Sequence, residues 1–165
     1  MQGGVLDRLE PPFLDLQAAT WVGPDRYEMR ADARRFENWE RNVAGQLGLG
    51  AAVDYALGWG LADIAARIEP LAAELRRRLA EIPGVSVRDR GRRPCGIVTV
   101  TVEGKPAREI VAALRQRRIN CHTSPGSTPV DARAGGLPDL VRASVHYYNT
   151  EEEVARFAAA VTALA

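Results

Sequence analysis

The segment from Val141 to His146 combines an apolar row with a polar row that could bind an anion. Side chains alternate between the two faces of a strand, so a strand here would place Arg142, Ser144 and His146 on one face. The planar guanidinium of Arg142 suits a carboxylate. The pattern alone favours an ion pair between Arg142 and a local acid such as Asp139, with a ligand carboxylate as the alternative. We expect the apolar row to meet a layer of helices, which leaves Arg142 on the opposite face.

The other residues with reactive or ionisable side chains give weaker signals. Lys105 is the only lysine among the 22 lysines and arginines, and it stands in a Gly-Lys-Pro turn where a solvated charge is expected. Cys95 and Cys121 make no disulfide framework, and neither has a second ligand at metal spacing. Arginine clusters such as Arg76-Arg77-Arg78 have acids nearby in the sequence and are expected to lie on solvated faces. No metal site is predicted.

The first half of the chain is expected to hold an arm and two long helices. Residues 1–41 include Pro11-Pro12, which breaks a helix, and a polar stretch from Thr20 to Arg35 that looks irregular. A helix is predicted over 42–57, where small residues are frequent and indicate a close approach by a neighbouring backbone. Apolar spacing predicts a second helix over 61–82, which Pro70 should kink or split.

The second half has the pattern of an α+β domain. The predicted elements, in order, are strands over 85–89 and 97–102, a helix over 106–117, a strand over 119–122, a long loop over 123–139, a strand over 141–146 and a helix over 150–164. Thr150 and Glu153 should form a capping box at the start of the last helix. This order favours a mostly antiparallel sheet with helices on one face.

Composition excludes several classes of function. The formal net charge is +1, so no overall field attracts nucleic acid or anionic lipid. No apolar run approaches the roughly 20 residues that span a bilayer. We therefore expect no nucleic-acid partner and no membrane contact. The two cysteines without a disulfide framework favour a reducing, cytoplasmic setting.

Four segments resemble the carboxy-terminal part of class V pyridoxal-phosphate (PLP) enzymes, the family of cysteine desulfurases and selenocysteine lyases. They are residues 35–37 (Arg-Phe-Glu), 42–45 (Asn-Val-Ala-Gly), 48–52 (Gly-Leu-Gly-Ala-Ala) and 148–153 (Tyr-Asn-Thr-Glu-Glu-Glu). The resemblance implies the small carboxy-terminal domain of a fold-type I PLP enzyme that acts on an amino acid. It also implies that Arg142, which precedes the Tyr-Asn-Thr segment without a gap, binds the substrate carboxylate.

The resemblance is incomplete where the family holds its cofactor. The family forms a Schiff base between PLP and a lysine, and the position of Lys105 does not suit that role, so no catalytic residue and no covalently bound PLP are expected in this chain. Glu40 takes the place of a threonine that helps to hold the cofactor phosphate, and it would repel that group. Asn42 and, more weakly, Arg41 are the candidate cofactor-binding residues. Cys121 precedes the loop that carries the sulfur acceptor in desulfurases and is expected to be a small buried cysteine.

Taken with the resemblance, the chain is predicted to have two parts. Residues 1–41 would be an arm that remains from the large cofactor domain, and 42–165 the small α/β domain. The predicted function is that of a domain of an aminotransferase-like PLP enzyme, inactive alone. A stand-alone binding or assembly module and one half of a split enzyme remain alternatives. We expect a homo-oligomer or a complementing PLP-domain chain, and the residues do not separate aminotransferase, lyase and epimerase.

Overall fold

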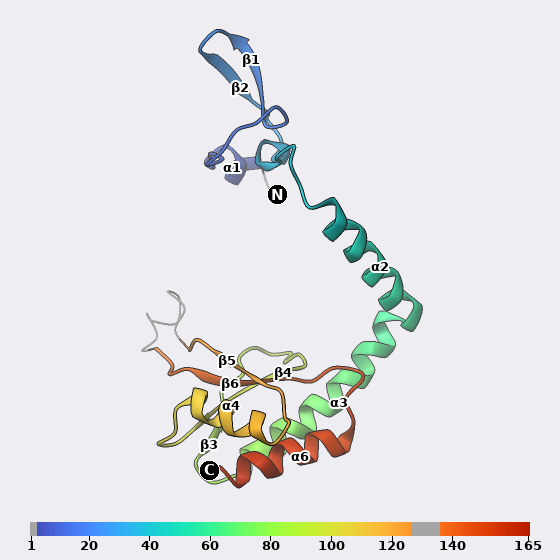
Figure 1. Cartoon of the computed structure of the whole chain (residues 1–165), viewed down its shortest axis with the longest axis vertical. Coiled ribbons are helices and arrows are strands. Elements are labelled where there is room, and N and C mark those ends of the chain that lie inside the picture. Colours follow the sequence, from blue (N-terminus) through green and yellow to red (C-terminus); the bar gives the residue numbers. More distant parts are fainter. Residues whose placement is uncertain (1–2, 127–135) are drawn as a thin grey trace. The chain divides into compact units, whose positions relative to one another are not determined.

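A computed structural model of the chain describes residues 3–126 and 136–165 (Figure 1). It divides the chain into two compact units, Met1–Tyr55 and Ala56–Ala165, so that the division falls inside a helix. The predicted boundary lies earlier, between residues 41 and 42. The assignment of the first segment to a cofactor domain stays a prediction, because compactness alone does not test it.

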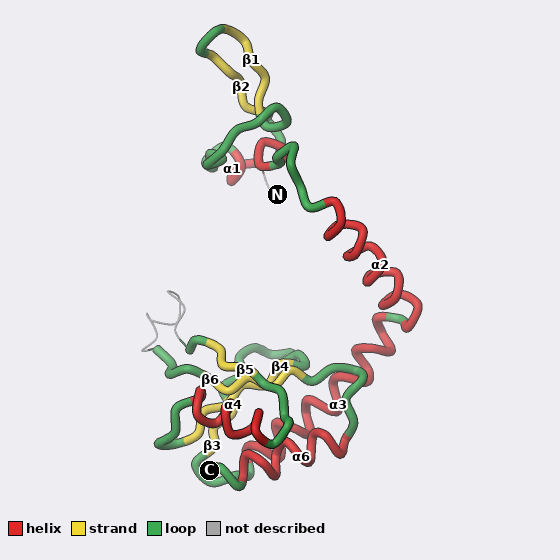
Figure 2. Tube along the Cα trace, in the orientation of Figure 1, coloured by secondary structure: helices red, strands yellow, loops and turns green. Residues whose placement is uncertain are grey.

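The first unit contains a short β-hairpin where an irregular stretch was expected. Helix α1 (Gly3–Leu6) is followed by strands β1 (Ala19–Gly23) and β2 (Arg26–Met29), which pair antiparallel, and by the 3-10 helix η1 (Ala33–Phe36) (Figure 2). The expectation of an irregular segment from Thr20 to Arg35 is therefore wrong. Arg35 is buried and its Nε donates to the Arg30 carbonyl at 2.7 Å, which fastens the end of the hairpin to η1.

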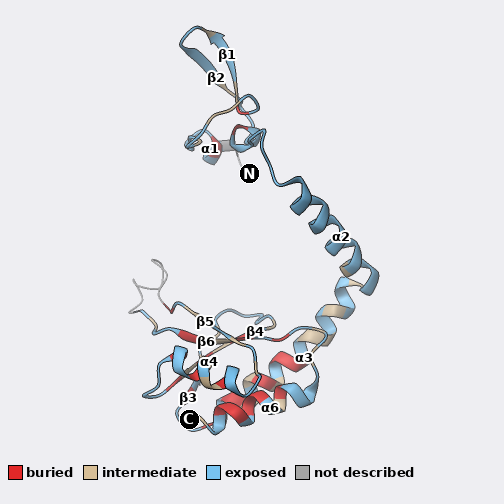
Figure 3. Cartoon of the chain, viewed as in Figure 1, coloured by how far each residue is buried: buried red, intermediate tan, exposed pale blue. Residues whose placement is uncertain are grey.

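Helix α2 (Val43–Trp59) has no buried residue although its sequence is apolar (Figure 3). The Asn42 side-chain oxygen accepts a hydrogen bond from the Gly45 amide at 2.8 Å, which caps the helix. A Cβ at Gly45 would lie 2.6 Å from the Asn42 side-chain nitrogen, so a larger residue there would require the Asn42 side chain to shift. The large apolar side chains that α2 exposes are Val43, Leu47, Leu49, Val53, Tyr55, Leu57 and Trp59.

Helix α3 (Leu61–Ala80) follows α2 after a break at Gly60, not at Pro70. Gly60 has a φ of 85°, a left-handed conformation that glycine adopts at little cost. Pro70 lies inside α3, which continues through it, so of the kink or split expected there the split does not occur. The turn after Pro70 stays helical because Leu71, Leu75 and their neighbours are buried in the core, and such packing overrides local propensity. No helix of the described residues is long and apolar enough to cross a membrane.

The second unit is an α+β layer structure, as predicted. Its antiparallel sheet has the order β3-β4-β6-β5, formed by β3 (Val85–Val87), β4 (Ile97–Val102), β6 (Leu140–Ser144) and β5 (His122–Ser124). Helices α3, α4 (Ala107–Gln116) and α6 (Glu151–Thr162) cover one face of this sheet (Figure 1). The core lies between the two layers, and the sheet contributes Val98, Val100, Val102, Val141, Ala143 and Val145 to it.

Strand β5 begins three residues later than predicted. The amide of Arg118 donates to the Arg115 carbonyl at 2.9 Å, and that of Ile119 donates to the Leu114 carbonyl at 3.0 Å. Arg118 has a φ of 57°, the left-handed conformation that commonly ends a helix. The chain is therefore still completing the end of α4 at Ile119, and the strand expected over 119–122 lies instead at 122–124.

Polar contacts fix the start of α6, and some of them join it to α3. Thr150 and Glu153 form the predicted capping box. Arg67 of α3 donates to both oxygens of Glu151, at 2.5 and 3.1 Å, and to the Asn149 carbonyl at 3.0 Å. This hydrogen bonding holds the pKa of Glu151 at about 2.

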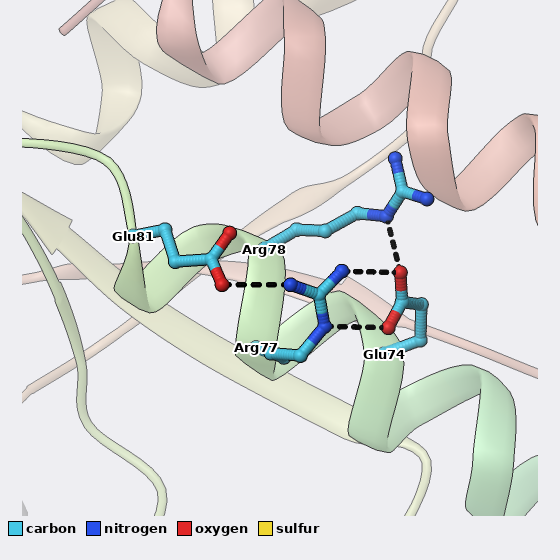
Figure 4. Close-up of polar contacts among 4 residues, drawn as sticks. All are labelled: Glu74, Arg77, Arg78 and Glu81. Atoms are coloured by element: carbon cyan, nitrogen blue, oxygen red, sulfur yellow. Dashed lines mark hydrogen bonds and ion pairs between the residues drawn. The ribbon is translucent and has the colours of Figure 1, made fainter.

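A further ion-pair cluster lies on the exposed side of α3. Glu74 accepts hydrogen bonds from Arg77 and Arg78, and Arg77 also reaches Glu81 (Figure 4). The hydrogen bonds from Arg77 and Arg78 lower the pKa of Glu74 from 4.5 to about 2. The solvated face predicted for this arginine cluster is thus confirmed for Arg77 and Arg78.

We predict that Glu74→Gln lowers the stability of the protein near neutral pH and that the effect disappears in acid. A carboxyl whose pKa is depressed on folding stabilises the folded state fully above its unfolded pKa, here about 4.5. This stabilisation is lost as the pH falls through about 2. Urea unfolding at a series of pH values measures the difference between the two proteins.

The matched control is Glu103→Gln, because the Glu103 carboxylate is exposed and contacts no described partner. Its stability should follow that of the unmodified chain at every pH. A Glu74→Gln effect of equal size at pH 7 and pH 2 would contradict the prediction.

Candidate functional site

Three polar side chains form a row across the sheet face opposite the described helices α3, α4 and α6. The register pairs Arg142 of β6 with Thr99 of β4 on one side and with His122 of β5 on the other. Directly paired residues in an antiparallel sheet share a face. The next pair along the strands, Val98 with Ala143, is buried in the core, so the row lies on the opposite face. The expected orientation of Arg142 is therefore observed.

The Arg142 guanidinium has no partner among the described residues. Arg142 is partly buried, and its Nε is buried without any hydrogen bond. Asp139 is exposed, and no ion pair joins it to Arg142 in the described part of the chain. The pairing that the sequence pattern alone favoured is thus not formed. A buried donor without a partner costs about 1–3 kcal/mol, so this side chain is suited to an anion from outside these residues.

Thr99 belongs to a largely buried network of polar side chains. The Asp89 carboxylate accepts hydrogen bonds from the Thr99 amide at 2.7 Å and from its hydroxyl at 2.6 Å. Its second oxygen accepts from Arg76 Nε at 2.6 Å. The Arg76 and Asp89 side chains are only 17% and 11% exposed, so Arg76 does not lie on the solvated face that was expected for its cluster. The sequence reasoning missed this network because its members come from α3, the segment after β3, and β4.

The remaining polar residues of the predicted strand differ from expectation. Ser144 pairs with Ile97 and is exposed. His146 lies beyond the end of β6, so it does not extend the row as the alternation predicted. A turn begins there, because the Asn149 amide donates to the His146 carbonyl at 3.0 Å. The His146 ring instead stacks on Tyr148 with a centroid distance of 4.9 Å.

The residues considered for cofactor binding have other contacts. The Lys105 ammonium donates to the Leu164 and Ala165 carbonyls, which places it at the end of the last helix. Such a contact satisfies carbonyls that the helix leaves unpaired, and it does not fit a Schiff-base lysine. The Asn42 side-chain oxygen serves the cap of α2, and Arg41 is exposed. A role for Asn42 or Arg41 toward a cofactor stays a prediction.

The two cysteines have different environments. Cys95 is exposed, whereas Cys121 is half-buried and packs against the core. Burial raises the pKa of the Cys121 thiol above its ordinary value, although the charge of Arg115 acts in the opposite direction. Cys121 lies outside β5 and is only half-buried, so it is less buried than was predicted. The described residues contain no cluster of side chains that could hold a metal ion.

Arg142 lines neither of the two hollows described in the second unit. Two hollows of about 360 and 840 Å³ lie in the second unit. The smaller is lined by Ala143, Ser144 and Val145, the larger by Asp139 and Val141, and neither includes Arg142.

Comparison with known proteins gives a consistent result. Residues 5–157 match the family "Aminotransferase class-V". A probable cysteine desulfurase of Xylella fastidiosa (strain 9a5c) is 31% identical over 152 residues, which cover 92% of this chain and 36% of the relative. A probable cysteine desulfurase of Methanothermobacter thermautotrophicus is 28% identical, with 91% of this chain and 38% of the relative covered.

Solved structures show the same relation. The apo cysteine desulfurase of Thermococcus onnurineus matches with a TM-score of 0.76 and 28% identity, over 98% of this chain and 40% of that protein. A cystine C–S lyase bound to cysteine persulfide matches with a TM-score of 0.71 and 25% identity, over 98% of this chain and 40% of that protein. A variant of the same lyase carries glycine covalently linked to its PLP cofactor. The chain thus spans about two fifths or less of the length of these relatives.

We predict that Cys121 reacts slowly with thiol reagents near neutral pH, because the thiolate is the reactive form and burial disfavours it. Exposed Cys95 serves as the internal reference. The rates of modification by 5,5′-dithiobis(2-nitrobenzoate) in Cys95→Ser and Cys121→Ser, each with one thiol left, should differ by at least tenfold. Faster modification of Cys121 than of Cys95 would contradict this.

Proposed function

Because this chain belongs to the class-V aminotransferase family, we propose that it forms the carboxy-terminal part of a PLP-dependent enzyme that acts on an amino acid. In this proposal Arg142 binds the carboxylate of the substrate. The observation that carries it is the buried Arg142 Nε, which has no partner among the described residues and lies on the sheet face opposite α3, α4 and α6. A carboxylate would satisfy this donor and the outer nitrogens of the guanidinium together, since the two groups match as planar forks.

The role of Arg142 is to bind and to orient. The side chain is partly buried among strands, so its guanidinium has little freedom to follow a ligand. A carboxylate held by two parallel hydrogen bonds is fixed in direction as well as position. This arrangement would present the rest of an amino acid to chemistry supplied from elsewhere in the complete protein.

The residues of this chain do not supply a site for covalent PLP, although enzymes of the family use that cofactor. The only lysine is engaged at the end of the last helix, so we propose that the chain alone is inactive. The half-buried Cys121 with its raised pKa does not favour a sulfur-accepting role for this residue. Aminotransfer, elimination and epimerisation all remain compatible with carboxylate binding by Arg142.

Helix α2 favours association with another chain. It exposes a run of large apolar side chains and buries none, and apolar surface of this extent drives association. We propose that the chain forms a homo-oligomer or pairs with a complementing PLP-domain chain through α2. Light scattering should report an assembly larger than 18 kDa, and Leu47→Glu combined with Val53→Glu should reduce its mass. A monomer in the unmodified chain, with α2 helical, would contradict the association.

The role of Arg142 can be tested by kinetics after the chain is combined with an amino-terminal PLP domain of the family. Arg142→Ala should raise KM for the amino acid at least tenfold, because truncation of one partner of a buried charge pair is costly. Arg142→Lys should recover only part, since an ammonium lacks the planar fork. Arg88→Ala is the matched control, because exposed Arg88 contacts Thr101 on the same sheet face. An unchanged KM in Arg142→Ala would overturn the assignment.

The proposed inactivity of the chain alone has a spectroscopic test. Purified protein mixed with PLP should show no stoichiometric absorbance near 420 nm, roughly the band of a PLP aldimine. Lys105→Ala provides the control, because it removes the only lysine. A one-to-one absorbance band in the unmodified chain that Lys105→Ala abolishes would contradict the proposal.

A further inference from the structure

Asp89 is an acid in direct contact with the row that contains Arg142. Its Oδ1 lies 2.6 Å from the Thr99 hydroxyl and 2.7 Å from the Thr99 amide. Thr99 is the residue of β4 that pairs directly with Arg142. The carboxylate therefore lies one residue away from the Arg142 side chain, which has no partner among the described residues.

The pairing of Thr99 with Arg142 brings their side chains close together. The Val145 amide donates to the Gly96 carbonyl at 2.8 Å, which makes Gly96 and Val145 a hydrogen-bonded pair. Hydrogen-bonded and non-hydrogen-bonded pairs alternate along an antiparallel ladder. Thr99 and Arg142 therefore form a non-hydrogen-bonded pair, the type in which facing Cα atoms are about 4.5 Å apart and side chains are closest.

Asp89 already forms an ion pair with Arg76. Its Nε donates to Asp89 Oδ2 at 2.6 Å, and both side chains are largely buried. The Nη2 atom of Arg76 also donates to the carbonyls of Cys95 at 2.6 Å and Ile97 at 2.9 Å. These three contacts hold the Arg76 guanidinium at the edge of the sheet and orient it toward Asp89.

We propose that Arg76 is a positioning residue that prevents Asp89 from pairing with Arg142. The Asp89 carboxylate contacts both Arg76 and Thr99, and Thr99 is the residue that pairs with Arg142. Pairing of Asp89 with Arg76 therefore leaves the positive charge of Arg142 for a ligand. Without Arg76, the Asp89 carboxylate would be the local partner of Arg142 and would compete with ligand as an intramolecular group of high effective concentration. This inference rests on the proposed function, because it explains why the carboxylate site stays open.

The test follows the Arg142 Nε–H signal in the side-chain ¹⁵N spectrum of the full chain. This N–H is buried, so slow exchange with water should make it visible, and its absence in Arg142→Lys identifies it. Acetate is the probe, and chloride at equal ionic strength is the control for non-specific salt effects. Saturable acetate shifts are expected in the unmodified chain.

Four variants separate charge competition from structural damage. Arg76→Met keeps the apolar stem and should weaken acetate binding at least tenfold. The double variant Arg76→Met with Asp89→Asn lacks the competing charge and should bind within about threefold of the unmodified chain. Asp89→Asn alone should bind at least as tightly. Arg77→Met is the matched control on α3 and should have no effect, because Arg77 pairs with exposed acids.

Each result decides between the two proposals. If acetate does not shift the signal in the unmodified chain, both the carboxylate role of Arg142 and the inference fail. If acetate binds through Arg142 but Arg76→Met binds it equally well, only the inference is overturned. Failure of the folded double variant to recover binding also overturns it, since Arg76 would then act through structure alone. Should Arg76→Met not fold, weaker binding in Asp89→Asn than in the unmodified chain would overturn it.

Discussion

Strand β6 directs alternate side chains to opposite faces of the sheet, and the candidate site depends on this two-residue period. Val141 and Ala143 enter the core beneath the helices, so Arg142 between them must point to the uncovered face. The core therefore fixes the orientation of a charged residue that it does not contact. A shift of one residue in the register of β6 would bury the guanidinium among apolar side chains, which is far more costly than any single contact of the site.

The sequence pattern predicted an element correctly where the contacts that determine it lie close together in the sequence. The bounds of β4 match the run of β-branched residues at 97–102, and the capping box at Thr150 forms as expected. The hairpin of β1 and β2 was missed although aromatic and β-branched residues flank its Gly-Pro-Asp turn. The later start of β5 follows from the left-handed backbone conformation of Arg118. This conformation could not be predicted from an arginine in the sequence.

Long-range polar contacts were not predictable from the pattern. Arg76, Arg77 and Arg78 are identical in type and adjacent in sequence, yet only Arg76 enters a largely buried ion pair. What distinguishes it is the position of Asp89 and of two carbonyls near the start of β4, which only the folded chain brings together. Arg142 likewise has no partner among the described residues, which is a property of the assembled sheet. The proposed role of Arg142 could be expected from resemblance, but the absence of a pair with Asp139 could not.

The account requires that a carboxylate from outside these residues completes the coordination of Arg142. The most direct measurement is a crystal structure of the chain combined with a PLP domain of the family and a bound amino acid. The predicted result is a substrate carboxylate with oxygens about 2.7–2.9 Å from the Arg142 guanidinium nitrogens. A substrate carboxylate bound by other residues, with Arg142 paired to Asp139 or Asp89 instead, would contradict it.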